Sequence, residues 1–325
     1  MAHKILVLGG HGFIGKSLVK ALTSANHDVV ALSRRNGLDL HCYDSTKDYL
    51  KRYQPEIIFN FVAHVGGLPY VAERHAVIFA DNTRMALNLY RAVQEVCPES
   101  SIVNPLSNCC YPGQAEVYTE SDWLKGDVHP SVYSYGNAKR FIYTLATCYK
   151  VQFGVETRHF FIPNAFGPGD RTNPAMVHAL NGMIIRMLNA EKEQHSTFEI
   201  WGSGTPIREW IYVEDVANLL CLGIDRNLEL QEPLNLAQGQ GYSIRESAVM
   251  IAKAIGFRGE IVFRNDYPDG AARKIMDTHR FEQIFGNYRF IDHYDAICKT
   301  VDYYRSILFE PAKGRLNNTC ARVSG

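Results

Sequence analysis

The chain has 325 residues, of which 46% are hydrophobic and 21% charged, and this balance excludes an extended disordered protein. Its 34 lysines and arginines equal its 34 aspartates and glutamates, so no net charge draws the chain to nucleic acid or to an anionic membrane. No apolar run approaches the roughly 20 residues of a membrane span, and the first residues lack a signal-peptide pattern. The eight cysteines are scattered without metal-ligand spacing, so we expect reduced thiols, no metal site and a cytoplasmic location.

The first half of the chain alternates short apolar runs with longer helical patterns. We expect strands at 4–8, 28–32, 56–62, 101–104 and 155–161, and helices at 14–22, 47–53, 80–96 and 134–153. Near-continuous apolar strands separated by helices indicate a parallel sheet covered on both faces. The predicted fold class is therefore α/β, with a Rossmann-type doubly wound sheet whose ligand crevice lies at the carboxyl ends of the strands.

After about residue 163, shorter elements alternate with loops rich in Gly, Pro and Asn. We expect a helix at 174–189, a strand at 198–201 and a helix at 243–256. This pattern predicts a smaller C-terminal α/β lobe that binds substrate. The predicted division is a dinucleotide-binding domain at 1–165 and about 212–237, a substrate lobe at 166–211 and 238–310, and a flexible tail at 311–325.

A glycine-rich loop follows the first strand and opens a helix. Glycines at 9, 12 and 15 allow a tight turn, close approach to a pyrophosphate and close helix–strand packing. The helix N-terminus then offers unpaired N–H groups to the phosphates. The alternative is a glycine-rich turn without a ligand, but the flanking strand and helix are the context that dinucleotide binding requires. The predicted cofactor contacts here are Gly9, Gly12, Phe13, Ile14 and Gly15.

The cofactor's 2′ position is read near the end of the second strand, where this chain has Arg34 and Arg35. Arginine provides a planar fork of donors that suits a 2′-phosphate, whereas an acidic residue there would bind the hydroxyls of NAD. The alternative is that both arginines are solvated surface charges. We therefore favour NADP(H) over NAD(H), with Asp39 as a further candidate contact to the adenine.

Tyr135 and Lys139 are four residues apart, which places both on one helix face. An ammonium group beside a phenol favours the phenolate, so this spacing predicts a lowered pKa for Tyr135. Ser107, just after the fourth strand, supplies the hydroxyl that completes a hydride-transfer set. Tyr133 has Asn137 in place of a lysine and is the poorer candidate.

Taken together, these residues resemble the extended short-chain dehydrogenase/reductase, or NAD-dependent epimerase/dehydratase, family, and within it the GDP-L-fucose synthases. The likeness covers about residues 4–310. Besides the glycine loop and the Tyr/Lys pair, it is carried by 63–67 (AHVGG), 107–112 (SNCCYP), 164–170 (NAFGPGD), 201–210 (WGSGTPIREW) and 268–274 (PDGAARK). It implies 3,5-epimerisation and NADPH-dependent 4-keto reduction of a GDP-4-keto-6-deoxy-hexose.

The resemblance also implies roles for individual residues. Epimerisation beside a ketone needs a base and an acid on opposite faces of the sugar, and the matching residues are Cys109 and His178. Cys110 is expected to pack, and Ala63 to contact the cofactor. A homodimer through a four-helix interface, built from the helices at 80–96 and 134–153, is also implied. The matching substrate-binding positions are Asn164, His178, Arg186, Trp201, Arg208 and Asp269.

Several positions depart from the family pattern, and they cluster around the sugar. This chain has His64 in place of a lysine, Asn108 in place of a serine, and an unusual 171–177 segment. Two alternatives therefore stay open. One is a 4-ketoreductase, dehydrogenase or epimerase of another GDP- or NDP-sugar, such as a GDP-heptose. The other is a catalytically silent dinucleotide-binding protein, against which the intact hydride-transfer set argues.

Overall fold

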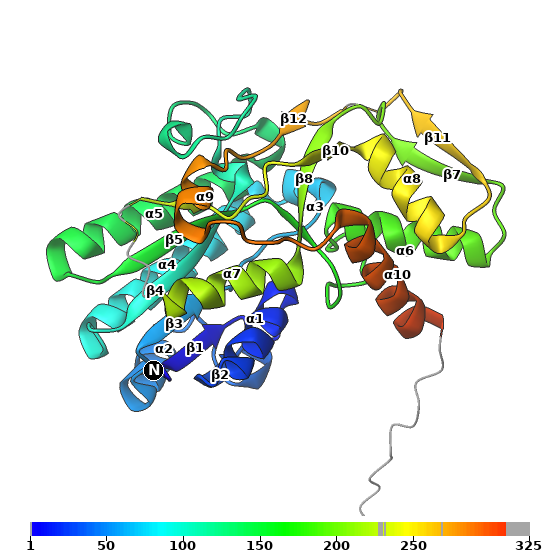
Figure 1. Ribbon diagram of the computed structural model, residues 1–325. Coiled ribbons are helices and arrows are strands. Elements are labelled where there is room, and N and C mark those ends of the chain that lie inside the picture. Colours follow the sequence, from blue (N-terminus) through cyan, green and yellow to red (C-terminus); the bar gives the residue numbers. More distant parts are fainter. Residues whose placement is uncertain (1, 227–229, 231, 268, 310–325) are drawn as a thin grey trace, which may run out of the picture.

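The centre of the fold is a six-stranded parallel sheet of order β2-β1-β3-β4-β5-β9 (Figure 1). The computed structural model describes residues 2–226, 230, 232–267 and 269–309, so the predicted tail lies outside the described residues. The direction of strand addition reverses between β1 and β3. In sheets of this topology, ligands bind in the crevice outside the carboxyl ends of the strands at that point. The predicted α/β fold class is confirmed. The six strands are β1 (Lys4–Leu8), β2 (Asp28–Leu32), β3 (Ile57–Asn60), β4 (Ser101–Ser107), β5 (Thr157–Ile162) and β9 (Leu234–Asn235).

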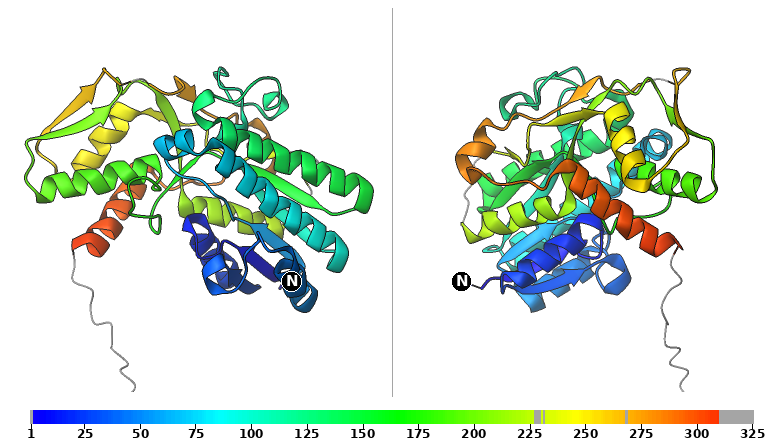
Figure 2. Two further views of the ribbon diagram at one scale, coloured as in Figure 1. Left: turned by 180° about the vertical axis from the view of Figure 1, so that it is seen from behind. Right: turned by 45° about the vertical axis from the view of Figure 1, so that its right-hand side comes forward.

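Helices cover both faces of this sheet because its strands are apolar on both sides. Ile5 and Val7 of β1 pack with α1 and α7, whereas Leu6 and Leu8 pack with α2, α4 and α5. Seen from behind, α4 and α5 lie side by side across one face (Figure 2). The five helices are α1 (Phe13–Ser24), α2 (Tyr43–Tyr53), α4 (His75–Val96), α5 (Tyr133–Phe153) and α7 (Val213–Asp225).

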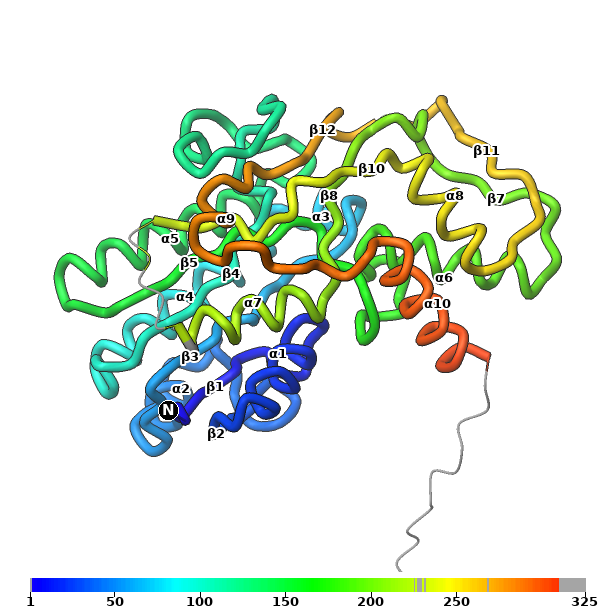
Figure 3. The backbone as a smooth tube through the Cα atoms, viewed as in Figure 1, coloured from blue at the N-terminus to red at the C-terminus, as the bar shows by residue number. Residues whose placement is uncertain are grey.

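A second lobe has its own apolar core, built from three helices and two small sheets. Strand β8 pairs with β6, β10 and β12, and β7 pairs with β11. Figure 3 follows the chain from β8 along α7, back onto the large sheet, and out again to β10. The elements are β6 (Asn164–Phe166), β7 (Thr197–Trp201), β8 (Ile207–Tyr212), β10 (Gly241–Ser243), β11 (Glu260–Arg264), β12 (Arg273–Lys274), α6 (Ala179–Lys192), α8 (Ile244–Ile255) and α10 (His293–Phe309).

Short helices complete the connections between the two lobes and around the crevice. They are α3 (Leu68–Glu73), α9 (His279–Phe285), and the 3₁₀ helices η1 (Arg34–Asn36), η2 (Asn108–Cys110), η3 (Glu120–Asp122) and η4 (Pro130–Val132). None of the helices in the described ranges has both the length and the apolar character that a membrane crossing demands.

The helix expected at 174–189 begins only at Ala179. The N–H groups of Met176 and Val177 both donate to the carbonyl oxygen of Asn173, which makes a separate turn. His178 then has an extended backbone, and its N–H donates to the side chain of Asp170. The later start therefore places His178 at the N-terminus of α6 instead of inside the helix.

Candidate active site

The backbone of the glycine loop leaves no room for a Cβ at two of its glycines. Gly9 has φ +78°, and a Cβ added there would lie 2.7 Å from the carbonyl oxygen of Phe61. A Cβ at Gly15 would lie 2.2 Å from the carbonyl oxygen of Gly9, so α1 packs directly on the loop. No side chain caps the N-terminus of α1 at Gly12. The first N–H groups of α1 thus suit a pyrophosphate, and the residues present fit a dinucleotide.

Arg34 and Arg35 are exposed on η1, directly after β2. The Asn36 side chain contacts the His11 ring at 2.6 Å, which joins η1 to the glycine loop. Asp39 accepts hydrogen bonds from the backbone and ring of His41. Burial acts to raise the pKa of Asp39, but these bonds and the charge of Arg34 hold it below its ordinary value. The two guanidinium groups are therefore the accessible cations at this end of the loop.

Ser107, Cys109 and Tyr135 come from three elements that meet, β4, η2 and α5. Ser107 ends β4, and its Oγ accepts from the Cys109 N–H at 3.2 Å. Helix α5 approaches η2 so closely that a Cβ on Gly136 would lie 2.4 Å from the carbonyl oxygen of Cys109. Gly136 is thus required for this contact, which explains why glycine stands between the paired Tyr135 and Lys139.

Lys139 lies under the ring of Tyr135. Its Nζ is 5.7 Å from the ring centroid and donates to the carbonyl oxygen of Pro105 at 2.9 Å. Burial lowers the pKa of Lys139 to about 8. Burial, followed by the neighbouring Cys109 and Cys110, raises the pKa of Tyr135 above its ordinary value. The expected lowering is therefore wrong for the protein alone, because burial raises the pKa and Tyr135 keeps its phenolic proton.

His178 reaches the glycine loop from the second lobe. Its Nδ1 is 2.9 Å from the Asp170 Oδ2, and its ring centroid is 5.2 Å from that of Phe13. The Asp170 side chain is only 2% exposed and also accepts from the Asn181 amide. Burial acts to raise the pKa of Asp170, but the bonds from His178 and Asn181 keep it low. An ionised Asp170 holds the proton on Nδ1 and leaves Nε2 as the working nitrogen.

Two cations lie on adjacent strands of the second lobe. Arg208 on β8 is directly paired in register with Lys274 on β12. Burial, then the charges of Lys274 and Arg208, lowers the pKa of His129, which places both cations near this ring. Tyr118 and Asp269 act electrostatically on Arg208 from other loops. This arrangement suits a diphosphate.

The remaining predicted substrate residues have different surroundings. Trp201 is 62% exposed and stacks on Tyr267, with ring centroids 4.6 Å apart and planes 5° apart. Asp269 accepts from the N–H and the hydroxyl of Ser203 and so fixes the turn after β7. Arg186 on α6 lies over the ring of Phe198 on β7. It is therefore on a different element from Arg208 of β8.

Asn164 on β6 donates to the carbonyl oxygen of Glu209 at 2.9 Å, which fixes its amide. Glu209 itself is fully buried and was not predicted from the sequence. Its carboxylate accepts from the N–H groups of Gln238, Gly239 and Met276. Burial outweighs these bonds and raises the pKa of Glu209 to about 7. The side chain joins β8 to the segments that follow β9 and β12, and no local sequence signal marks it.

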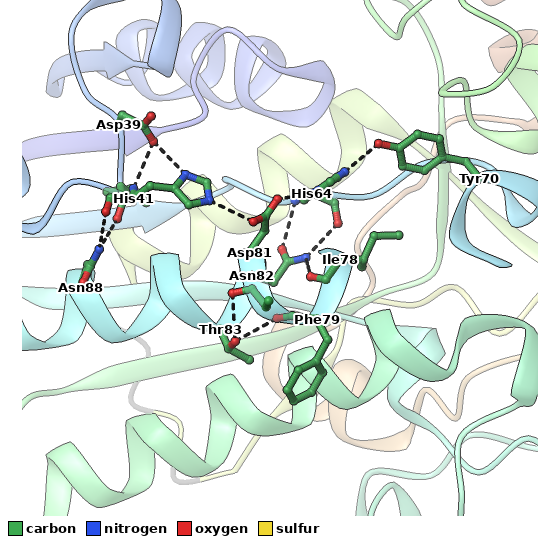
Figure 4. A network of polar contacts seen from close by, with 12 residues as sticks. Asp39, His41, His64, Tyr70, Ile78, Phe79, Asp81, Asn82, Thr83 and Asn88 are labelled. Carbon is green, nitrogen blue, oxygen red and sulfur yellow. Dashed lines mark hydrogen bonds and ion pairs between the residues drawn. The ribbon is translucent and has the colours of Figure 1, made fainter. Parts of the chain in front are cut away.

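His64 belongs to a chain of polar contacts along the crevice (Figure 4). Its Nδ1 is 2.6 Å from the Asp81 Oδ2, and its Nε2 is 2.8 Å from the Tyr70 hydroxyl. The other oxygen of Asp81 lies 3.4 Å from the His41 ring, which in turn contacts Asp39. The histidine noted in the sequence as a departure thus connects the segment after η1 to α3.

Comparison with known proteins identifies the family of the chain. The NAD dependent epimerase/dehydratase family matches residues 5–237. A probable GDP-L-fucose synthase of Drosophila melanogaster is 30% identical over 313 residues, covering 93% of this chain and 97% of that protein. The GDP-L-fucose synthase of Escherichia coli K12 is 27% identical over 93% of this chain and 96% of that protein.

Solved structures give the same result. A GDP-L-fucose synthetase from Naegleria fowleri bound to NADP has a TM-score of 0.82 at 25% identity, covering 92% of this chain and 93% of that chain. A UDP-glucose 4-epimerase from Thermotoga maritima shares the fold, with a TM-score of 0.78 at 21% identity over 94% of this chain and 99% of that chain. The chain therefore belongs to the NAD-dependent epimerase/dehydratase family, as an NAD(P)-dependent enzyme of the extended short-chain dehydrogenase type.

Proposed function

We propose that the protein converts a GDP-4-keto-6-deoxy-hexose by 3,5-epimerisation followed by NADPH-dependent reduction at C4. The observation that carries this proposal is the contact of α5 with η2 at Gly136, which brings Cys109 beside the Tyr135/Lys139 pair and Ser107. The relatives described above, named GDP-L-fucose synthases, support a GDP-linked substrate.

The first half-reaction moves protons at carbons next to the ketone. The 4-keto group acidifies the C–H bonds at C3 and C5, so a modest base can remove these protons. The Cys109 thiolate takes the proton and becomes a thiol. The Nε2 of His178 returns a proton on the opposite face, with its ring oriented by Asp170. Inversion follows because removal and return occur from different sides of the sugar.

The second half-reaction reduces the ketone. NADPH, when bound at the glycine loop, would supply the hydride for this reduction. Tyr135 gives its phenolic proton to the C4 oxygen, and its raised pKa means that it carries this proton at neutral pH. Ser107 positions the same oxygen, and Lys139, held by the Pro105 carbonyl, orients the nicotinamide ribose.

Two pairs of cationic side chains would bind the phosphates of NADPH and of the sugar nucleotide. Arg34 and Arg35 suit the 2′-phosphate of NADPH, which favours NADP(H) over NAD(H). Arg208 and Lys274 suit the diphosphate of the sugar nucleotide. Trp201 has one face on Tyr267 and remains largely exposed, so an aromatic base can stack beside it.

The test is to incubate the purified protein with GDP-4-keto-6-deoxy-mannose and NADPH, to follow cofactor absorbance and to identify the product sugar. Formation of GDP-L-fucose is the expected result. Reduction to an unepimerised sugar would contradict the role of Cys109 and His178. Cys109→Ala is expected to abolish epimerisation while it leaves Tyr135-dependent reduction measurable.

A second candidate is reduction or epimerisation of a different GDP-sugar. A GDP-L-colitose synthase of Yersinia pseudotuberculosis is 28% identical over 93% of this chain and 97% of that protein. His64 and Asn108 replace the lysine and serine of the family pattern, and Asn108 contacts both Ser107 and Cys109. Turnover of a dideoxy- or heptose-linked GDP-sugar at a higher kcat/KM than the 6-deoxy-mannose substrate would favour this candidate.

We further propose a cytoplasmic homodimer in which α4 and α5 pair with the same helices of a second copy. These helices expose Val77, Leu87, Val151 and Phe153, each at least 42% accessible. Cys97, Cys110 and Cys148 are free thiols, as is usual in a reducing compartment. Leu87→Asp should shift the mass measured by light scattering from dimer to monomer.

A further inference from the structure

Asn108 lies between the two groups that react in the two halves of the proposed function. Its Oδ1 is 3.3 Å from the Ser107 Oγ and 3.6 Å from the Cys109 Sγ. One amide oxygen therefore accepts from both the hydroxyl and the thiol. The Asn108 side chain is buried, with 4% exposure, so these contacts are shielded from bulk water.

The other end of the same amide has no partner. The Asn108 Nδ2 is buried and makes no hydrogen bond to any residue that the structure describes. The observed orientation is therefore held only from the Oδ1 side, by the bonds from Ser107 and Cys109. Rotation by about half a turn exchanges the oxygen and nitrogen, directs N–H donors at Ser107 and Cys109, and leaves the oxygen where the nitrogen was. Both orientations leave one buried polar atom unpaired.

The two forms of Cys109 need opposite partners. A thiol donates and needs an acceptor, whereas the thiolate that removes a proton from carbon needs a donor. Cys109 acts electrostatically on Cys110 of η2, on Tyr135 of α5, and on Tyr118 in the loop before η3. None of these three is a cation. Lys139 and Arg140 act on Cys110.

We propose that Asn108 is a positioning residue for Cys109, whose amide stabilises the thiolate through its N–H and the thiol through its oxygen. The proton from the sugar carbon moves to the Cys109 sulfur, and the amide turns to the observed orientation as the thiol forms. This inference depends on the role of Cys109 in the proposed function. It adds a residue that is absent from the predicted set and that departs from the family's serine.

The test is the pH dependence of Cys109 alkylation in Asn108→Asp. Aspartate keeps the size and an acceptor oxygen but removes the donor and adds a negative charge. We expect the pH at which iodoacetamide reaches half its maximal rate on Cys109 to rise by about one pH unit or more. Quantification by mass spectrometry of the peptide that contains Cys109, with Cys109→Ser as the blank, isolates this thiol. Cys110 is fully buried, and burial raises its pKa to about 12, so it stays unlabelled near neutrality.

Two further variants separate the donor from the charge. Asn108→Ala removes donor and acceptor without adding charge and should raise the midpoint less than aspartate does. Asn108→Ser restores a group that both donates and accepts and should return the midpoint towards that of the native protein. Thermal melts and NADPH binding by fluorescence check that each variant is folded.

Substrate readouts then separate the half-reactions. Deuterium exchange from solvent into C3 and C5 of the keto sugar should fall about tenfold or more in Asn108→Asp. Oxidation of GDP-L-fucose by NADP⁺, which needs no epimerisation, should fall much less. An equal fall in both rates would overturn the inference, because it would indicate general damage to the site.

The alkylation experiment tests the role of Asn108, and the turnover experiment tests the proposed epimerisation, so either can be overturned without the other. An unchanged alkylation midpoint in folded Asn108→Asp would overturn the inference whatever the sugar. The other outcome is a raised alkylation midpoint in Asn108→Asp together with no deuterium exchange by the native protein. That result would support the amide–thiol pairing and overturn the proposed epimerisation.

Discussion

The Asp170 carboxylate, buried behind α6, holds the His178 imidazole through a contact of 2.9 Å between Oδ2 and Nδ1. The same oxygen accepts from the His178 backbone N–H and from the Asn181 amide. One buried oxygen thus fixes the position, the rotamer and the proton of the histidine. Two of the predictions below follow from this pair.

Asp170→Asn should reduce epimerisation more than reduction. The amide can present a donor to Nδ1, which moves the proton to Nε2 and gives the wrong tautomer. We expect deuterium exchange into the keto sugar to fall about 100-fold or more, since a positioned acid or base contributes rates of that order. NADP⁺-dependent oxidation of GDP-L-fucose serves as the control. Equal loss of the two activities would argue against a proton role for His178.

The same residue predicts a pH dependence of stability. The pKa of Asp170 in the folded protein lies below its ordinary value of 3.8. Its stabilising bonds are therefore complete above about pH 4 and are lost as the pH falls through the lower, folded pKa. Asp170→Asn should melt at a lower temperature than the native protein at pH 7, and the difference should shrink below pH 4. A difference that stays constant with pH would contradict the assigned ionisation.

Gly136→Ala should disable both half-reactions. The added Cβ would lie 2.4 Å from the Cys109 carbonyl oxygen, so α5 and η2 must separate. Displacement of reacting groups by about 1 Å costs on the order of 100-fold in rate, and we expect that loss in both kcat values. Gly126→Ala is the matched control, because its nearest contact would be 3.5 Å, to the side chain of Pro112. Normal activity in Gly136→Ala would show that the contact is dispensable.

Arg34→Ala should weaken NADPH binding selectively. Loss of a charge-assisted contact to the 2′-phosphate is expected to raise the Kd for NADPH about 10- to 100-fold and to leave that for NADH nearly unchanged. Lys51→Ala, an exposed change of equal charge on α2, controls for the altered net charge. Equal weakening of both cofactors would place the 2′ group elsewhere and direct the test to Arg35.

Glu209→Gln should destabilise the second lobe. Its carboxylate accepts three backbone N–H bonds, whereas a carboxamide has one acceptor oxygen and directs an NH₂ group at one of those donors. We expect a loss of about 1–3 kcal/mol in the free energy of unfolding. Denaturant melts measure this loss, and the KM for the GDP-sugar should rise because β8 carries Arg208. Unchanged stability would show that the three backbone N–H groups around residue 209 tolerate a neutral carboxamide.

The sequence predicts those features that depend on residues close together in the chain. The strands 4–8 and 28–32 have the expected bounds, because their apolar runs are uninterrupted. The glycine loop and the Tyr135/Lys139 spacing are equally local. Glu209 and Asp81 are different, because their hydrogen-bond partners Met276 and His64 lie far from them in the chain, and only folding brings them together. The Tyr135/Lys139 spacing predicts a lowered pKa for Tyr135, but burial raises it, and burial depends on contacts that the spacing does not contain.

The path of the chain between the lobes limits how they can be separated. Strand β8 belongs to the second lobe, α7 and β9 pack on the large sheet, and β10 returns to β8. Neither lobe is therefore one continuous stretch of polypeptide, and no single cut yields two intact halves. A fragment ending after β5 would lack β9, the strand that covers its sheet edge. Any change in the angle between the lobes must bend several connections at once, so the lobes cannot move as freely as two domains joined by a single linker.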